Sequence, residues 1–170
     1  MASSFIGFKD NGFWARDGFV ESFQLLLFEE IQLQYQDQFE WLNNYKKNLA
    51  LQSLPLIYGG MSMCLDETLT DSNRTAIILE LLDDIGKKIV NDNEYLTGTH
   101  LNSLRKTVRN YLVDMKEFDW DEKEIEKQLK DGHYGELPFE KYKRGFSLLR
   151  ALVVGQLNIK ADTEITYWGD

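Results

Sequence analysis

The chain has 170 residues, 43% of them hydrophobic and 28% charged, and its formal net charge at pH 7 is −9. This length and composition predict one folded domain, residues 1–170, around a single hydrophobic core. The excess of acidic residues argues against nucleic acid as a direct partner, because phosphate binding relies on clusters of lysine and arginine, and it favours a basic protein partner.

The first twelve residues are predicted to form an extended arm and a turn, with no hairpin signal between two good strands. They lead into the densest apolar segment of the chain, which runs from Phe13 to Tyr35. Gly18 lies early in this segment and disfavours a helix start far upstream of it. We therefore place the helix start at Arg16 or Asp17, and assign Trp14, Arg16 and Asp17 to a pre-helix turn.

From Phe19 onward the apolar residues follow helical spacing and cover nearly the whole circumference, which predicts a buried core helix. Three glutamates, Glu21, Glu29 and Glu30, interrupt the run. The apolar stretch is therefore too short to cross a membrane, where each of these charges would be costly.

Five further helices are predicted from apolar stripes and from capping residues. They cover about Asp37–Ser53, Asp71 or Ser72 to Val90, Thr97 or Thr99 to Met115, Asp119 or Asp121 to about residue 130, and Pro138 to Leu157. Residues 55–70 read equally as a buried loop or a distorted short helix. Residues 158–170 read as a short strand or an extended tail, anchored by Trp168. The predicted fold is an all-α, irregular bundle of about six helices with this extended C-terminal segment.

Charge is unevenly distributed along the chain. Residues 66–97 hold three basic and eight acidic side chains, and residues 119–136 hold three basic and seven acidic ones, so the two stretches together supply the whole net charge. The helix that begins near Asp119 has only Ile125 and Leu129 as apolar contacts. The basic group Arg105, Lys106 and Arg109 is able to pair with acidic neighbours inside the protein.

No residue pattern indicates a cofactor or a metal ion. The histidines, His100 and His133, lie 33 positions apart without zinc-ligand spacing, and Gly59-Gly60 lacks the basic residue of a phosphate-binding loop. His100 is expected to be a surface or capping residue. Cys64, the single cysteine, excludes an internal disulfide, and no signal peptide is recognisable, so we expect a cytoplasmic protein.

The opening GFWARDGFVESFQLLLFEEI has a Trp-x-x-Asp motif, Trp14 to Asp17, followed by a long apolar helix. With the size and acidity of the chain, it resembles small helical immunity proteins of bacterial polymorphic toxin and contact-dependent inhibition systems. The resemblance implies that acidic side chains bind a basic toxin domain and cover its active site. The contact residues predicted on this basis are Asp83, Asp84, Asp119, Trp120, Asp121, Glu122 and Glu126.

Two alternatives belong to other functional classes. One is a small helical enzyme with a pocket around Trp14, Arg16, Asp17, Tyr58 and Cys64. The other is a homo-oligomeric regulatory or structural module, for which a large exposed apolar face would be the sign.

Overall fold

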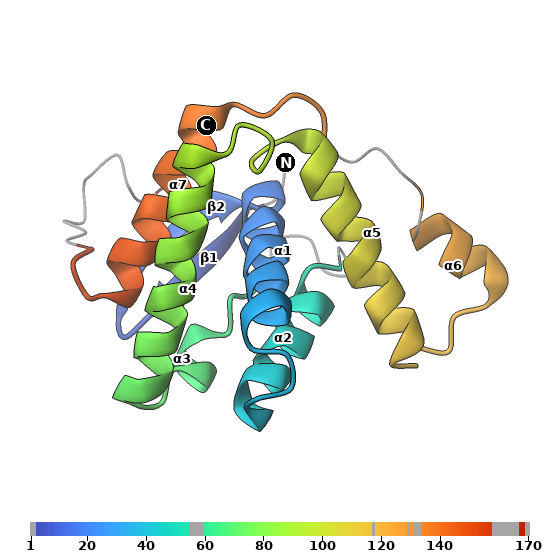
Figure 1. Cartoon of the computed structure of the whole chain (residues 1–170), viewed down its shortest axis with the longest axis horizontal. Coiled ribbons are helices and arrows are strands. Elements are labelled where there is room, and N and C mark those ends of the chain that lie inside the picture. The colour runs from blue at the N-terminus through green and yellow to red at the C-terminus, as the bar shows by residue number, and fades with distance from the viewer. Residues whose placement is uncertain are drawn as a thin grey trace.

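The computed structural model describes residues 3–54, 60–116, 118–128, 130, 134–157 and 167–168, the last two by their backbone only. Within these ranges it contains seven helices and one small three-stranded sheet (Figure 1). The elements are β1 (Ser3–Phe8), β2 (Asn11–Arg16), α1 (Asp17–Gln34), α2 (Glu40–Gln52), α3 (Leu65–Thr68), α4 (Ser72–Asn91), α5 (Gly98–Asp114), α6 (Glu122–Gln128), α7 (Phe139–Val153) and β3 (Tyr167–Trp168). The predicted helical fold is confirmed, with six substantial helices and the single-turn α3.

The extended N-terminal segment forms a β-hairpin, so the prediction of an arm and a turn without a hairpin is wrong. β1 and β2 pair antiparallel, with Phe5 opposite Trp14. The turn residues Lys9 and Asp10 both have positive φ angles, 48° and 60°, as a type I′ turn requires. Asn-Gly, the usual signal for this turn, comes two positions later at 11–12, within β2. The apolar residues also lie on both faces of the hairpin, which hides the alternation of a half-buried strand.

The third strand comes from the other end of the chain. β3 runs parallel to β2 and pairs with it at Trp14 and Ala15. This strand confirms extended structure at Tyr167–Trp168, whereas the other predicted positions, 158–166 and 169–170, lie outside the described residues.

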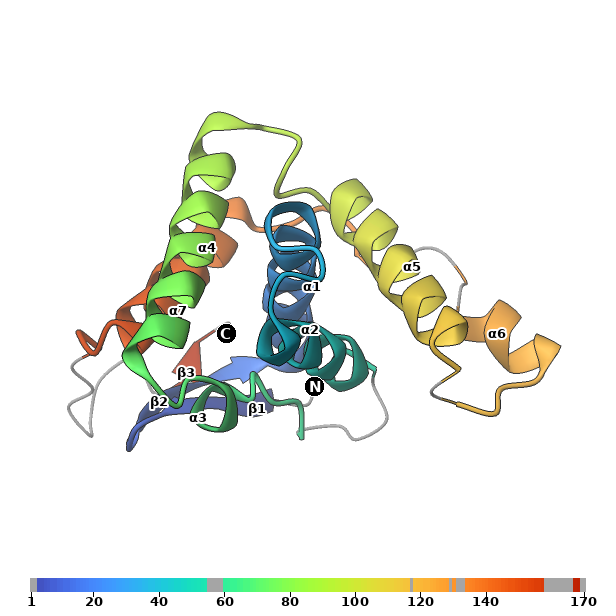
Figure 2. The ribbon, with the colours of Figure 1, turned by 60° about the horizontal axis from the view of Figure 1, so that its bottom comes forward.

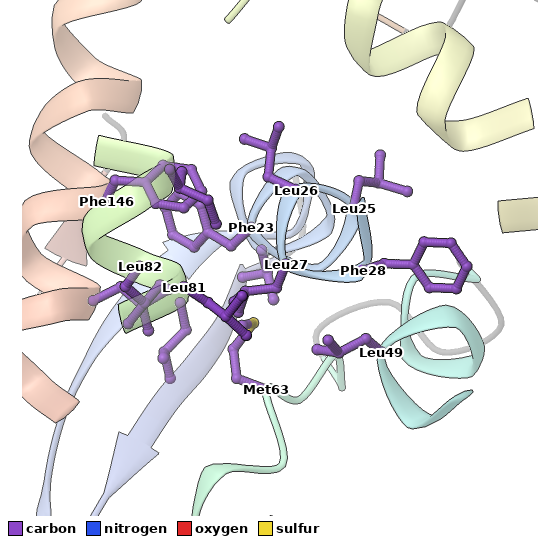
Figure 3. Close-up of a cluster of buried hydrophobic side chains, with 14 of the residues drawn as sticks. Phe23, Leu25, Leu26, Leu27, Phe28, Leu49, Met63, Leu81, Leu82 and Phe146 are labelled. Carbon is purple, nitrogen blue, oxygen red and sulfur yellow. The ribbon is translucent and has the colours of Figure 1, made fainter. Parts of the chain in front are cut away.

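Helix α1 is the centre of the core, as predicted. Every residue from Phe19 to Phe28 is buried. Figure 3 shows side chains of neighbouring positions, Leu25 to Phe28, pointing from α1 in several directions. On one side Phe23 meets Phe146 of α7 edge to face, with 4.6 Å between ring centroids. A helix that is apolar on all sides is stable here only because other elements surround it.

The other long helices flank α1. Figures 1 and 2 show α4 and α7 together on one side of it and α5 on the other, while α2 packs near its C-terminal half. Two predicted caps are confirmed, since Asp71 accepts a hydrogen bond from the backbone N–H of Arg74, and Thr97 accepts one from that of His100. The undecided stretch 55–70 contains α3, and its positions 55–59 lie outside the described residues.

A buried ionic network joins α1 to α5. Glu21 accepts hydrogen bonds from Arg105 Nε at 3.0 Å and from Arg109 Nη2 at 3.3 Å. Arg109, which is fully buried, also donates to the side chain and carbonyl of Ser53, both at 3.0 Å. Tyr134 donates its hydroxyl hydrogen to the second oxygen of Glu21 at 2.8 Å. The expected internal pairing of the basic group is thus confirmed for Arg105 and Arg109.

No helix in the part of the chain that the structure describes is long and apolar enough to span a membrane.

Candidate functional site: an acidic arm and a polar hollow

Residues 118–128, called the acidic arm below, extend from the end of α5. Its helix α6 has no buried residue, and Figures 1 and 2 place it at the outer edge of the molecule, beyond α5. Asp121 caps α6 by accepting a hydrogen bond from the backbone N–H of Glu124 at 2.9 Å. A helix this short and this exposed gains little from core packing, because most helical stability in proteins comes from tertiary contacts.

The arm exposes most of its acidic side chains. Asp119, Asp121, Glu122 and Glu126 are all exposed. Glu124, by contrast, lies 3.3 Å from Lys127 in an ion pair and accepts a hydrogen bond from Gln128 at 2.7 Å. Asp119, Glu122 and Glu126 therefore present exposed carboxylates to a partner, and Asp121 is also exposed although one of its oxygens caps α6.

Two stacked aromatic residues hold the arm to the domain. The rings of Phe118 and Trp120 are nearly parallel, with 4.6 Å between centroids and 6° between planes. Both are half-buried and pack against the hydrophobic core. Ile125 is half-buried as well, while Leu129, the other predicted contact, lies outside the described residues. Trp120 thus lies between the core and the exposed carboxylates.

The predicted contact residues Asp83 and Asp84 lie elsewhere. They belong to α4, on the opposite side of α1 from the arm (Figure 1). Asp83 forms an ion pair with Arg150 of α7. Asp84 accepts hydrogen bonds from Lys87 at 2.7 Å and from Gln34 at 3.2 Å, and the bond from Lys87 is the main reason that its pKa is lowered. The structure does not bring the two predicted acidic stretches together.

The residues of the predicted pre-helix turn occupy regular elements instead. Trp14 and Arg16 belong to β2, and Asp17 is the first residue of α1. Asp17 accepts a hydrogen bond from Ser4 Oγ at 2.6 Å, and Ser4 in turn accepts one from the backbone N–H of Met61 at 3.0 Å. Asp17 therefore joins α1 to the hairpin through Ser4, which also binds the loop before α3, and the sequence motif alone does not reveal this structural role.

Trp14 lies on the outer face of the hairpin, 43% exposed, with its ring centroid 5.6 Å from that of Phe5. The Phe5 ring lies so close to the strand that a Cβ on Gly12 would come within 2.3 Å of it. The same Cβ would lie 2.4 Å from the main-chain carbonyl oxygen of Ile6, and this approach of the backbone requires glycine at position 12.

The predicted enzyme pocket is only partly described, because Tyr58 lies outside the described residues. Burial raises the pKa of the Cys64 thiol. A raised pKa keeps the sulfur protonated at neutral pH, which makes it a poor nucleophile.

A site not predicted from the sequence lies between α1, α4 and α5. A hollow of about 520 Å³ opens there, and its lining includes charged groups from four segments of the chain. These are Glu29 on α1, Lys88 on α4, Asp92 and Glu94 in the connection that follows, and His100 at the start of α5.

His100 is the most constrained group of this hollow. Its Nε2 lies 3.0 Å from Oε1 of Glu29, and its Nδ1 is hydrogen-bonded to the carbonyl oxygen of Tyr95. The bond to Glu29 is the main cause that raises the pKa of His100, and burial opposes it. The prediction of an ordinary surface or capping histidine is therefore wrong for its side chain. Glu29 lies 71 positions away in the sequence, so no local pattern connects the two residues.

The chemistry of the hollow is limited by these bonds. Both ring nitrogens of His100 are engaged, so neither is available in this arrangement to activate a hydroxyl as general base. Among the residues that the structure describes, no three or more histidine, cysteine or carboxylate side chains gather in a way that would hold a metal ion.

Comparison with known proteins identifies no family: no protein-family model matches the chain, and neither a curated protein nor a solved structure does.

Proposed function

We propose that this chain is a cytoplasmic immunity protein, which binds a basic bacterial toxin domain and neutralises it by covering its active site. The observation that carries the proposal is the acidic arm, whose helix has no buried residue and whose carboxylates are mostly exposed. Because α6 adds little to the core, the most distinctive feature of the arm is its acidic surface. The resemblance of the N-terminal sequence to immunity proteins supports the same function.

The arm combines the two features that strong protein interfaces need. Exposed carboxylates at Asp119, Asp121, Glu122 and Glu126 attract a basic partner and accelerate the encounter. Trp120 is an aromatic residue of the kind that dominates binding energy once water is excluded around it. The charges would then govern the association rate, and the aromatic residue would govern the lifetime of the complex.

The proposed contact face is the arm alone, rather than both acidic stretches. Asp83 and Asp84 already pair with Arg150 and Lys87 within the chain, and they lie across α1 from the arm. A partner that used them would first have to displace these internal cations. We therefore assign Asp119, Trp120, Asp121, Glu122 and Glu126 to the interface.

The proposal is tested by isolating the chain together with a basic protein encoded beside it and measuring the activity of that protein. The wild-type chain is expected to inhibit it at equimolar concentration. The double variant Glu122→Lys/Glu126→Lys is expected to need about tenfold more protein or higher for the same inhibition, because reversed charges repel a basic surface.

The matched control is Glu67→Lys/Glu140→Lys, which changes the net charge equally. Glu67 and Glu140 are exposed residues of α3 and α7, away from the arm. Equal inhibition by both double variants would reject the arm as the contact face. A wild-type chain that is recovered as a solitary, inert monomer would reject the immunity function itself.

A further inference from the structure

We propose that His100, Glu29 and the carbonyl group of Tyr95 form a pH-sensitive clasp that holds the first turn of α5 against α1 only while the imidazole carries both of its protons. The clasp closes one wall of the hollow described above. This inference is independent of the proposed binding function, because the clasp and the acidic arm share no residue.

The hydrogen-bond partners of His100 require the doubly protonated ring. A main-chain carbonyl oxygen is only an acceptor, and an ionised carboxylate is only an acceptor as well. Nδ1 faces the carbonyl oxygen of Tyr95 and Nε2 faces the carboxylate of Glu29, so both nitrogens must donate. A neutral imidazole has one donor and one acceptor, and it satisfies only one of these two partners.

The charged groups around the clasp come from every segment packed against it. On α1, Glu29 bonds the ring directly, and the neighbouring Glu30 binds Lys88 of α4. Asp92, in the connection between α4 and α5, adds a further attraction to the imidazolium, and Glu94 also lines the hollow. The N-terminal dipole of α5 acts in the opposite direction. The hydrogen bond to Glu29, with the bond to the Tyr95 carbonyl and the attraction of Glu29 and Asp92, outweighs the cost of burial and raises the pKa of His100.

Loss of the proton breaks one particular contact. The neutral ring keeps Nδ1–H on the nearby carbonyl of Tyr95, so a lone pair on Nε2 then faces Glu29. Oε2 of Glu29 is already buried without a hydrogen-bond partner in the part of the chain that the structure describes. The carboxylate would then retain no donor from the described residues, which is costly for a charge that is only 20% exposed. We expect the Glu29 side chain to move out into the hollow.

The structural change that follows loss of the proton is confined to the start of α5. Tyr95 stays attached to α1, because its hydroxyl donates to Glu30 at 3.1 Å, and burial raises the pKa of this phenol so that it keeps its hydrogen. The part of the clasp that is released is the link from His100 to Glu29. The amide of Leu101, bonded to the carbonyl of Thr97 at 3.0 Å, lies in the turn that this link holds.

The test follows the imidazole by NMR in the variant His133→Gln, in which His100 supplies the only histidine signal. His100 is expected to titrate clearly above the value of about 6.5 of an unperturbed imidazole. Adding Glu29→Gln, which keeps the shape of the side chain but removes its charge, is expected to lower that midpoint by about one pH unit or more. Glu94→Gln serves as the control, since Glu94 also lines the hollow without bonding the ring, and its effect should be much smaller.

A second measurement uses the unaltered protein. Hydrogen exchange protection of the Leu101 amide, corrected for the intrinsic pH dependence of exchange, is expected to fall as His100 loses its proton, while that of the α4 core does not. A His100 midpoint at or below about 6.5, or one that Glu29→Gln leaves unchanged, would overturn the clasp. Protection of Leu101 that does not follow the titration would also overturn it.

Discussion

At the scale of single residues, the structure is organised by polar groups on an otherwise apolar helix. Glu21, Glu29 and Glu30 all lie on α1, and each meets a basic side chain from α4 or α5. Apolar packing alone is weakly directional, whereas buried charges must find particular partners. These glutamates therefore tie α4 and α5 to α1.

In the buried network around Glu21, replacement of Arg109 should lower the stability of the protein most. Replacement by Leu is expected to destabilise the protein by about 3 kcal/mol, because it removes one of the partners of the buried Glu21 carboxylate and a donor to the Ser53 carbonyl. Urea unfolding measures the difference. The exposed neighbour Lys106 is the control, and Lys106→Ala should change stability by less than about 0.5 kcal/mol. A similar, small loss for both variants would show that the network does not hold α5.

The clasp residue His100 predicts a pH dependence of stability with a defined sign. Its folded-state pKa is raised, so its contribution is fully present below about pH 6.5 and is lost as the pH rises through the folded-state value. The difference in unfolding free energy between wild type and His100→Gln should therefore shrink from about pH 6 to pH 9. Chemical unfolding across this range measures it. A constant difference would mean that His100 stabilises the fold by packing alone.

At the scale of elements, α1 contributes most of the central packing. Leu27 is fully buried, so Leu27→Ala should cost about 3 kcal/mol through the cavity it leaves. Leu33, near the C-terminal end of the same helix, is 65% exposed, and Leu33→Ala should cost less than about 0.5 kcal/mol. Thermal or urea unfolding of the two variants compares them directly. Equal losses would contradict the burial of α1.

The elements that the sequence predicts well are those with local signals. Apolar stripes and the caps Asp71 and Thr97 predicted α4 and α5 to within a few residues. The hairpin was missed because Lys9 and Asp10 adopt a turn that other residues usually form. Such a turn is decided by the pairing of the strands on either side of it, which is a tertiary effect.

At the scale of the whole molecule, the sites depend on distances along the chain that no local pattern spans. The clasp joins Glu29 to His100, and the buried network joins Glu21 to Arg109, 88 positions away. The sequence showed two acidic stretches but not that α1 separates them (Figure 2). Asp119, Trp120, Asp121, Glu122 and Glu126 lie together on the arm, because they are close neighbours in sequence before and within α6.

We propose that the acidic arm is the surface through which this protein binds a basic partner. It is tested most directly by the association rate constant with that partner, measured at low and high salt for wild type and for the two charge-reversal variants. We expect Glu122→Lys/Glu126→Lys to slow association by about tenfold at low salt, with a much smaller effect at high salt, and Glu67→Lys/Glu140→Lys to leave it near the wild-type rate. Equal rates for all three proteins at low salt would contradict the claim.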